Sequence, residues 1–109
     1  MGSNIYRFST RDGARYITLN KRLVFDIFPF GWGWYGSDTN WTALVILEME
    51  YGPKTAVKYC FRFAREFLAD ITCDEFILTS GEIDFIIRKM ERNAARSTNL
   101  INDQPTQKP

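Results

Sequence analysis

Hydrophobic and polar residues alternate over the first quarter of the chain, which is the pattern of β-strands. Short runs of this kind cover Ile5–Ser9, Ala14–Leu19 and Leu23–Ile27. The pair Asp12-Gly13 separates the first two runs and is a strong signal for a tight turn, because glycine accepts a positive φ. The polar segment Asn20–Arg22 separates the second run from the third. These runs predict a three-stranded antiparallel meander.

The hydrophobic positions then change to helical spacing. Trp41–Tyr51 is almost wholly apolar, which predicts a helix near the centre of the fold. The preceding Ser37–Thr39 consists of residue types that cap helix starts. Gly52 ends this helix, and Pro53 suits the first turn of the next. A continuous amphipathic pattern predicts the second helix over Lys54–Ile71.

A third helix is predicted near the C-terminal end of the sequence. Thr79 precedes Glu82 by three positions, which is the spacing of a capping box. Apolar residues then recur at helical spacing, at Ile83, Ile86, Ile87, Met90 and Ala94. Before the cap, Phe76–Leu78 is either a short strand or a buried loop. From Ser97 to Pro109 the chain is polar without a period, which predicts a disordered tail.

Together these elements predict an α+β fold in which a three-stranded antiparallel meander packs against three helices, in the order β-β-β-α-α-(β)-α. The chain has 109 residues, so we expect one domain over residues 1–96 and a tail over residues 97–109. Aromatic residues make up 16% of the chain, and core filling is the favoured explanation because a small domain needs much apolar area per residue. The net charge of +1 provides no global field that would attract nucleic acid.

The two cysteines do not indicate a metal site, because Cys60 and Cys73 are separated by thirteen positions, which matches no ligand-pair spacing. Cys60 falls in an apolar helical pattern and is expected to be buried, whereas Cys73 is expected to be more exposed. The N-terminus lacks an apolar signal-peptide core, and no apolar run reaches the length of a membrane span. We therefore expect a cytoplasmic protein with reduced thiols and no membrane contact.

Residues 28–37 form the most unusual segment, with five aromatics and three glycines and no helical period. This segment resembles, together with later positions, a family of small bacterial, plasmid and phage-encoded proteins of unknown function. The residues that carry the resemblance are Trp32-Gly33-Trp34-Tyr35-Gly36-Ser37, Ala43-Leu44, Leu47, Ala56, Phe63, Leu78-Thr79 and Glu82-Ile83. The resemblance covers roughly residues 5 to 88. It implies a mobile-element or phage origin and brings no known activity.

The chain departs from that family at several positions. Trp34-Tyr35 stands where the family usually has Tyr-Gly, and Phe76 stands where a Trp is common. The family's charged segment before the aromatic loop is replaced by Phe25-Asp26-Ile27-Phe28, so Asp26 is an open candidate for its acidic residue.

The sequence offers no coherent set of catalytic residues. It contains no histidine, which removes the commonest general base and metal ligand. The spacing Gly31-x-Gly33-x-x-Gly36 matches the dinucleotide fingerprint formally, but bulky aromatics fill it and no βαβ unit follows. We therefore expect no cofactor and favour a protein that is not an enzyme.

For the other polar groups we prefer an interpretation without a catalytic or metal-binding role. Asp70, Asp74 and Glu75 cluster near the end of the second helix, but their spacing matches no metal-binding loop and favours a solvated turn. Four tyrosines could act as acids, although nothing in the sequence identifies a partner that would shift their pKa. They are Tyr16, Tyr35, Tyr51 and Tyr59.

The aromatic loop is the leading candidate for a binding site. Trp32, Trp34 and Tyr35 belong to the residue types enriched at interface hot spots. The alternative is that the tryptophans fill the core, and we expect one ring inward and one outward. The leading hypothesis is a non-catalytic protein-interaction module of phage or mobile-element origin, for example an inhibitor of a host defence system. An exposed aromatic patch would fit a homodimer interface equally well.

The alternative hypothesis is a nucleic-acid-binding protein that uses a basic stripe on the last helix. The stripe consists of Arg88, Lys89, Arg92 and Arg96. Residues four apart share a helix face, so such a stripe could follow phosphates. The ordinary solvent face of an amphipathic helix explains it equally simply and is favoured. Five cations of the predicted strands could extend the patch, namely Arg7, Arg11, Arg15, Lys21 and Arg22.

Overall fold

The structure is a computed structural model that describes residues 3–24 and 29–103, with side chains as far as Ala94. Its sheet is antiparallel and has the strand order β3-β2-β1-β4. The strands are β1 (Ile5–Arg11), β2 (Ala14–Leu19), β3 (Arg22–Leu23) and β4 (Phe76–Thr79). The predicted α+β fold and the order of its elements are confirmed. The segment whose sequence left strand and loop open is a fourth strand, and it pairs with β1.

Two tight turns set the register of the meander. Asp12 and Gly13 both have positive φ, at 51° and 80°, and so do Asn20 and Lys21, at 51° and 73°. Residue pairs of this kind match the twist of a two-residue hairpin, and both turns were indicated by their sequence. Of the third predicted run, Leu23–Ile27, Leu23 belongs to β3, and residues 25–28 lie outside the described part of the chain.

The helical elements are α1 (Ser37–Tyr51), α2 (Pro53–Glu66), the short 3₁₀ helix η1 (Leu68–Asp70) and α3 (Ser80–Asp103). The first helix begins slightly earlier than expected from an N-cap among Ser37–Thr39, because Gly36 occupies the N-cap position and residues 37–39 are already helical.

The other two helix predictions also need correction at their ends. The second helix does not run to Ile71, because Phe67 leaves the helical region at φ −123° and a 3₁₀ turn follows. The third helix continues to Asp103, although the polar sequence from Ser97 predicted a disordered tail. Residues 104–109 lie outside the described part.

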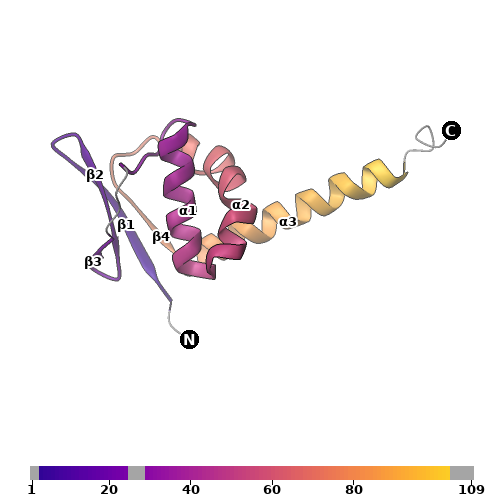
Figure 1. Ribbon diagram of the computed structural model, residues 1–109, viewed down its shortest axis with the longest axis horizontal. Coiled ribbons are helices and arrows are strands. Elements are labelled where there is room, and N and C mark those ends of the chain that lie inside the picture. The colour runs from indigo at the N-terminus through magenta and orange to yellow at the C-terminus, as the bar shows by residue number, and fades with distance from the viewer. Residues whose placement is uncertain (1–2, 25–28, 104–109) are drawn as a thin grey trace.

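All described helices lie on one side of the sheet (Figure 1). Figure 1 also shows α1 and α2 side by side, whereas α3 runs away from the sheet toward the opposite end of the molecule. A helix of 24 residues is about 36 Å long, so only its first part can pack on a domain of this size. That part contributes Ile83, Ile87 and Met90 to the core.

Side-chain hydrogen bonds fix the start and the packed part of α3. The predicted capping box is present: Thr79 N–H donates to Glu82 Oε1 at 2.9 Å, and Glu82 N–H donates to Thr79 Oγ1 at 3.3 Å. Further along, Tyr59 Oη donates to Glu91 Oε2 at 2.6 Å, and Arg62 Nη1 donates to the carbonyl of Met90 at 3.2 Å. These bonds join α2 to α3.

A cluster of aromatic rings forms the core beneath the sheet. Phe8 and Phe76 stack with ring centroids 4.1 Å apart, and they come from the neighbouring strands β1 and β4. Trp32 meets both rings edge to face, at 5.5 and 5.3 Å. Cys60 is buried and Cys73 is exposed, as the sequence predicted, and both are free thiols.

Candidate functional site

The face of the sheet that points away from the helices is covered by none of the described elements (Figure 1). Alternation along the strands sends one set of side chains inward, including the fully buried Tyr6, Phe8 and Ile17. The intervening residues point outward. We call this surface the open face and define it by Ile5, Arg7, Tyr16, Thr18, Leu23 and Ile77.

Several large apolar side chains are exposed on the open face. Ile5, Tyr16, Leu23 and Ile77 have exposed fractions between 40% and 50%. They come from all four strands, so no single local sequence pattern contains the surface. Because the cost of hydrating a contiguous apolar patch is relieved by contact with another molecule, such patches mark interaction surfaces.

One row of the open face crosses the whole sheet. The register pairs Leu23 with Thr18, Thr18 with Arg7, and Arg7 with Ile77. Neighbouring strands lie about 4.8 Å apart, so the row spans roughly 14 Å from Leu23 to Ile77. It therefore carries an apolar residue at each end and a cation one strand away from Ile77.

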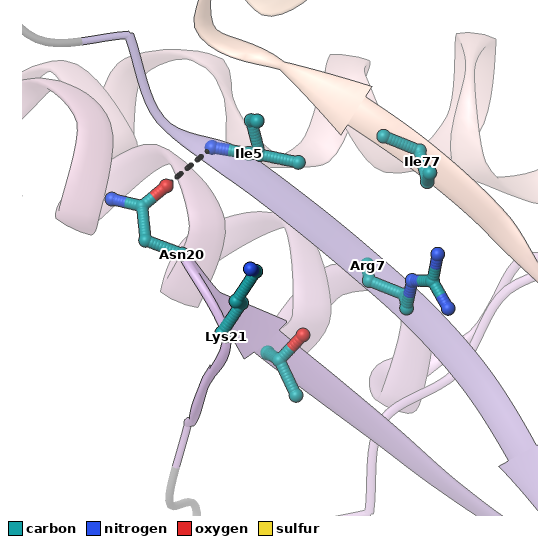
Figure 2. Close-up of a pocket in the computed structure, with 6 residues that line it drawn as sticks. Ile5, Arg7, Asn20, Lys21 and Ile77 are labelled. Carbon is teal, nitrogen blue, oxygen red and sulfur yellow. Dashed lines mark hydrogen bonds between the residues drawn. The ribbon is translucent and has the colours of Figure 1, made fainter.

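Two open hollows flank the centre of that row. The hollow shown in Figure 2 has a volume of about 610 Å³, and its outline is fixed by a hydrogen bond of 2.8 Å from Ile5 N–H to Asn20 Oδ1. It is lined by Ile5, Arg7, Thr18, Asn20, Lys21 and Ile77. The second hollow, of about 370 Å³, is lined by Arg7, Ser9, Arg11, Tyr16, Thr18, Leu23 and Glu75. Arg7 and Thr18 line both, so they form the ridge between the two hollows.

The open face carries free positive charge. Arg7, Arg11 and Lys21 are exposed, and none of them forms a hydrogen bond or ion pair through its side chain with another described residue. Glu75 is the carboxylate residue among those lining the two hollows. By contrast, Arg15 and Arg62 have carboxylate partners elsewhere in the molecule. The face therefore presents unneutralised cations among aliphatic side chains.

The first tryptophan of the aromatic loop, Trp32, packs in the core and anchors the loop there. Trp32 is fully buried, and its Nε1 donates to the carbonyl of Cys73 at 2.9 Å. The backbone N–H groups of Gly31 and Gly33 donate to Thr42 Oγ1 and to the carbonyl of Leu68. The ring of Trp32 has no accessible surface and belongs to the core, so its contact with a partner stays a prediction.

The second tryptophan and the neighbouring tyrosine are half-exposed, at 46% and 47% for Trp34 and Tyr35. One inward and one outward tryptophan is the arrangement that the sequence analysis expected. The Arg15 guanidinium lies 4.1 Å from the ring centroid of Trp32 and 5.0 Å from that of Trp34, so it links the exposed ring to the buried one. Arg15 follows the inward alternation of β2, which places this loop on the helical side, apart from the open face.

The basic stripe of α3 is partly neutralised. Arg88 Nε lies 2.6 Å from Asp84 Oδ2, and this bond lowers the pKa of the Asp84 carboxyl against the opposing effect of desolvation. Lys89 and Arg92 are exposed, and the side chain of Arg96 lies outside the described part. Figure 1 places the far end of α3 opposite the sheet, so the strand cations do not extend this stripe.

The tyrosines of the interior are hydrogen-bond donors. Burial, followed by the Glu50 carboxylate, raises the pKa of Tyr6, whose Oη donates to Glu50 Oε2 at 2.6 Å. Burial likewise raises the pKa of Tyr51, with a second contribution from Asp84. The bond to Glu91 is the first cause of the raised pKa of Tyr59. Phenols with raised pKa values are weaker acids and stay protonated at neutral pH, so these groups serve as structural hydrogen-bond donors.

Glu50 is the carboxylate that ties three elements together. Its burial alone would raise its pKa, but hydrogen bonds from Ser80, Tyr6 and Asn4 outweigh that effect and lower the pKa. The group lies where β1, α1 and the start of α3 meet, and Asn4 Nδ2 donates to it at 3.0 Å. A carboxylate held in this way stabilises the junction.

In the part of the chain that the structure describes, the acidic residues form no metal-binding cluster. Asp70, Asp74 and Glu75 are exposed, and no group of three or more histidine, cysteine or acidic residues within residues 3–24 and 29–103 could hold a metal ion. Asp26, which the resemblance left open, lies outside the described residues. Within the described part, no helix is both long enough and apolar enough to span a bilayer.

Sequence reasoning missed Ile5, Leu23 and Ile77 as members of a surface. The alternation of Ile5 and Ile77 with apolar neighbours was visible, but it did not reveal which face of the sheet the helices cover. Comparisons with protein-family models, curated proteins and solved structures found no match. The resemblance to a family of unknown function therefore stays a prediction.

Proposed function

We propose that this chain is a non-catalytic protein-binding module whose partner packs on the open face. The observation that carries the proposal is the group of half-exposed Ile5, Tyr16, Leu23 and Ile77 on a sheet face that no described helix covers. Interfaces combine a dry apolar centre with a polar, charged rim. The open face combines the same kinds of group in another arrangement, because its apolar side chains lie on both sides of Arg7 and Thr18, and Arg11 and Lys21 also line its hollows.

The side chains favour a protein over a nucleic acid as the occupant. Single-stranded nucleic acids bind to sheets through aromatic rings on which bases stack, together with cations that contact phosphates. The open face offers one ring, Tyr16, and three aliphatic side chains. Aliphatic groups gain from burying the apolar side chains of a partner but offer no stacking surface. Nucleic-acid binding through α3 is the second candidate, and there Arg88 is already engaged by Asp84.

An inhibitor of a host defence system is one form that such a module takes. That version of the proposal is supported by the small size of the chain and by the resemblance described above. It would require the open face, or the exposed rings of Trp34 and Tyr35, to contact a protein of the host.

Site-specific photo-crosslinking tests the proposal. A benzophenone-bearing phenylalanine is placed at Tyr16 on the open face, at Tyr35 on the aromatic loop, or at Phe61 on α2, which is 57% exposed and serves as the matched control. Each protein is irradiated in lysate of the source cells. We expect a discrete protein adduct from position 16 and none from position 61.

The other outcomes would place the binding site on another surface or contradict the proposal. An adduct from position 35 alone would move the binding site to the aromatic loop. Adducts equally strong from positions 16 and 61 would show nonspecific contact and contradict the proposal. An adduct that is destroyed by nuclease would favour the nucleic-acid alternative.

A further inference from the structure

We infer that the occupant of the open face is an acidic amphipathic protein segment, with a carboxylate that pairs with Arg7 and apolar side chains on both sides of that carboxylate. This inference rests on the proposed function and names the chemistry of the partner. Its basis is charge complementarity, because Arg7 lies on the row between Leu23 and Ile77 and has no ion-pair partner among the described residues.

The position of Arg7 makes it the specificity-determining residue of the face. It lines both hollows, and its strand neighbours on either side are Thr18 and Ile77. A partner that covers the apolar residues must also cover this guanidinium and remove its water. Burying an unpaired charge is strongly unfavourable, whereas a carboxylate accepts two parallel hydrogen bonds from a guanidinium. A partner without an acidic group at this point is therefore selected against.

A second copy of the chain fits the open face poorly. In a twofold-symmetric dimer the same surface is used on both sides. Face-to-face packing would bring Arg7, Arg11 and Lys21 of both copies into one interface, in which each copy has Glu75 as the carboxylate residue among those lining the two hollows. Juxtaposed like charges oppose association in an interface. The surplus positive charge therefore points to a foreign, acidic partner.

The row across the sheet sets the dimensions of the segment. Its apolar ends are roughly 14 Å apart, and Arg7 lies about 5 Å from the Ile77 end. A helix rises 1.5 Å per residue, so these distances correspond to about nine or ten residues and to about one helical turn. A partner helix lying across the strands would thus place its acidic residue about one turn from one apolar contact and two turns from the other.

Selection from a displayed library of random 16-residue peptides, with the full chain as bait, tests the inference. Selected peptides are then measured by fluorescence anisotropy against wild type, Arg7→Gln, Arg7→Glu and Ile77→Ser. The matched control is Arg22→Glu, which makes the same change in net charge but lies on the edge strand beside Leu19 and Met49, outside both hollows of the open face. A further set of peptides carries lysine in place of the enriched acidic residue.

The inference predicts enriched peptides with an acidic residue between apolar ones. We expect Arg7→Gln to weaken binding at least tenfold, Arg7→Glu to weaken it further, and Arg22→Glu to leave it within about twofold. The lysine peptides should bind Arg7→Glu better than they bind wild type. If Arg22→Glu, which makes the same change in net charge, does not show this exchange of preference, overall charge does not explain it and direct pairing at position 7 does.

Two failures are distinguishable. If the selected peptides lose affinity with Ile77→Ser but not with Arg7→Glu, the open face binds proteins and the acidic partner is wrong. If no peptide is enriched, or if neither variant changes binding, both the inference and the proposed function are contradicted. A wild-type dimer in sedimentation that Ile77→Ser dissociates would show that a second copy is the occupant, which overturns the inference.

Discussion

Truncation of Trp32 and Trp34, two neighbouring aromatic residues of one loop, should have very different effects on stability. Trp32→Ala removes a fully buried ring that meets Phe8 and Phe76 edge to face and donates to the carbonyl of Cys73. Truncation of a buried Phe or Trp to Ala costs about 3–5 kcal/mol. Trp34→Ala removes a half-exposed ring whose contact with the Arg15 guanidinium is worth about 0.5–1 kcal/mol.

These costs are large relative to the free energy of unfolding, which is about 5–15 kcal/mol for a domain of this kind. Urea denaturation followed by far-UV circular dichroism measures them without relying on tryptophan fluorescence, which both substitutions change. We expect Trp32→Ala to be unfolded or close to it, and Trp34→Ala to lose no more than about 1 kcal/mol. Similar losses in the two variants would refute the assignment of one ring to the core and one to the surface.

Two further predictions concern the polar groups that hold the elements together. Tyr6→Phe removes a donor to the Glu50 carboxylate and should cost about 1.5–3 kcal/mol at pH 7, as measured by urea denaturation. Because the folded-state pKa of Glu50 is lowered, the ionised carboxylate stabilises the fold above the unfolded pKa, near 4.5, and this stabilisation is lost as the pH falls through the folded-state pKa. The difference in stability between Tyr6→Phe and wild type should therefore shrink at pH values below the folded-state pKa of Glu50. A difference that is independent of pH from 7 to 3 would contradict this cause. Thr79→Ala removes one half of the capping box and should cost about 1 kcal/mol, whereas Thr79→Ser should retain most of the stability, and an equal loss in both variants would argue against the cap.

Local chemistry explains which elements the sequence predicted well. The turn at Asp12-Gly13 needs residues that accept a positive φ, and the cap at Thr79 and Glu82 needs two side chains at a fixed spacing. Both requirements are contained within four consecutive residues. Periodicity likewise marked the strands of the meander and the buried face of α3, because burial on one side imposes a repeat of the matching period.

Contacts between distant segments explain what the sequence did not reveal. The pairing of β4 with β1 joins Phe76 to Phe8, and no local pattern of either segment specifies the other. The break at Phe67 also escaped prediction, because apolar spacing continues through Leu68 even though the backbone leaves the α-helix.

The candidate site illustrates the same limit. Ile5 and Ile77 alternate with buried neighbours as any strand residue does, and their exposure depends on all described helices lying on the other side of the sheet. In the aromatic loop, Trp32 is buried because it packs against Phe8 and Phe76, which the loop sequence does not contain. Residue type alone therefore made Trp32 and Trp34 equal candidates for contact with a partner.

The accessibility of isoleucine methyl groups to a soluble paramagnetic agent tests the central claim, an uncovered and apolar sheet face, most directly. Methyl-labelled protein reports all isoleucines in one spectrum, so the inward-facing Ile17 and the core residue Ile83 serve as internal references. We predict strong relaxation enhancement for Ile5 and Ile77 and little for the two references, independent of protein concentration. Protection of Ile5 and Ile77 equal to that of Ile17 would show that another part of the chain or a second copy covers the face, and it would contradict the account.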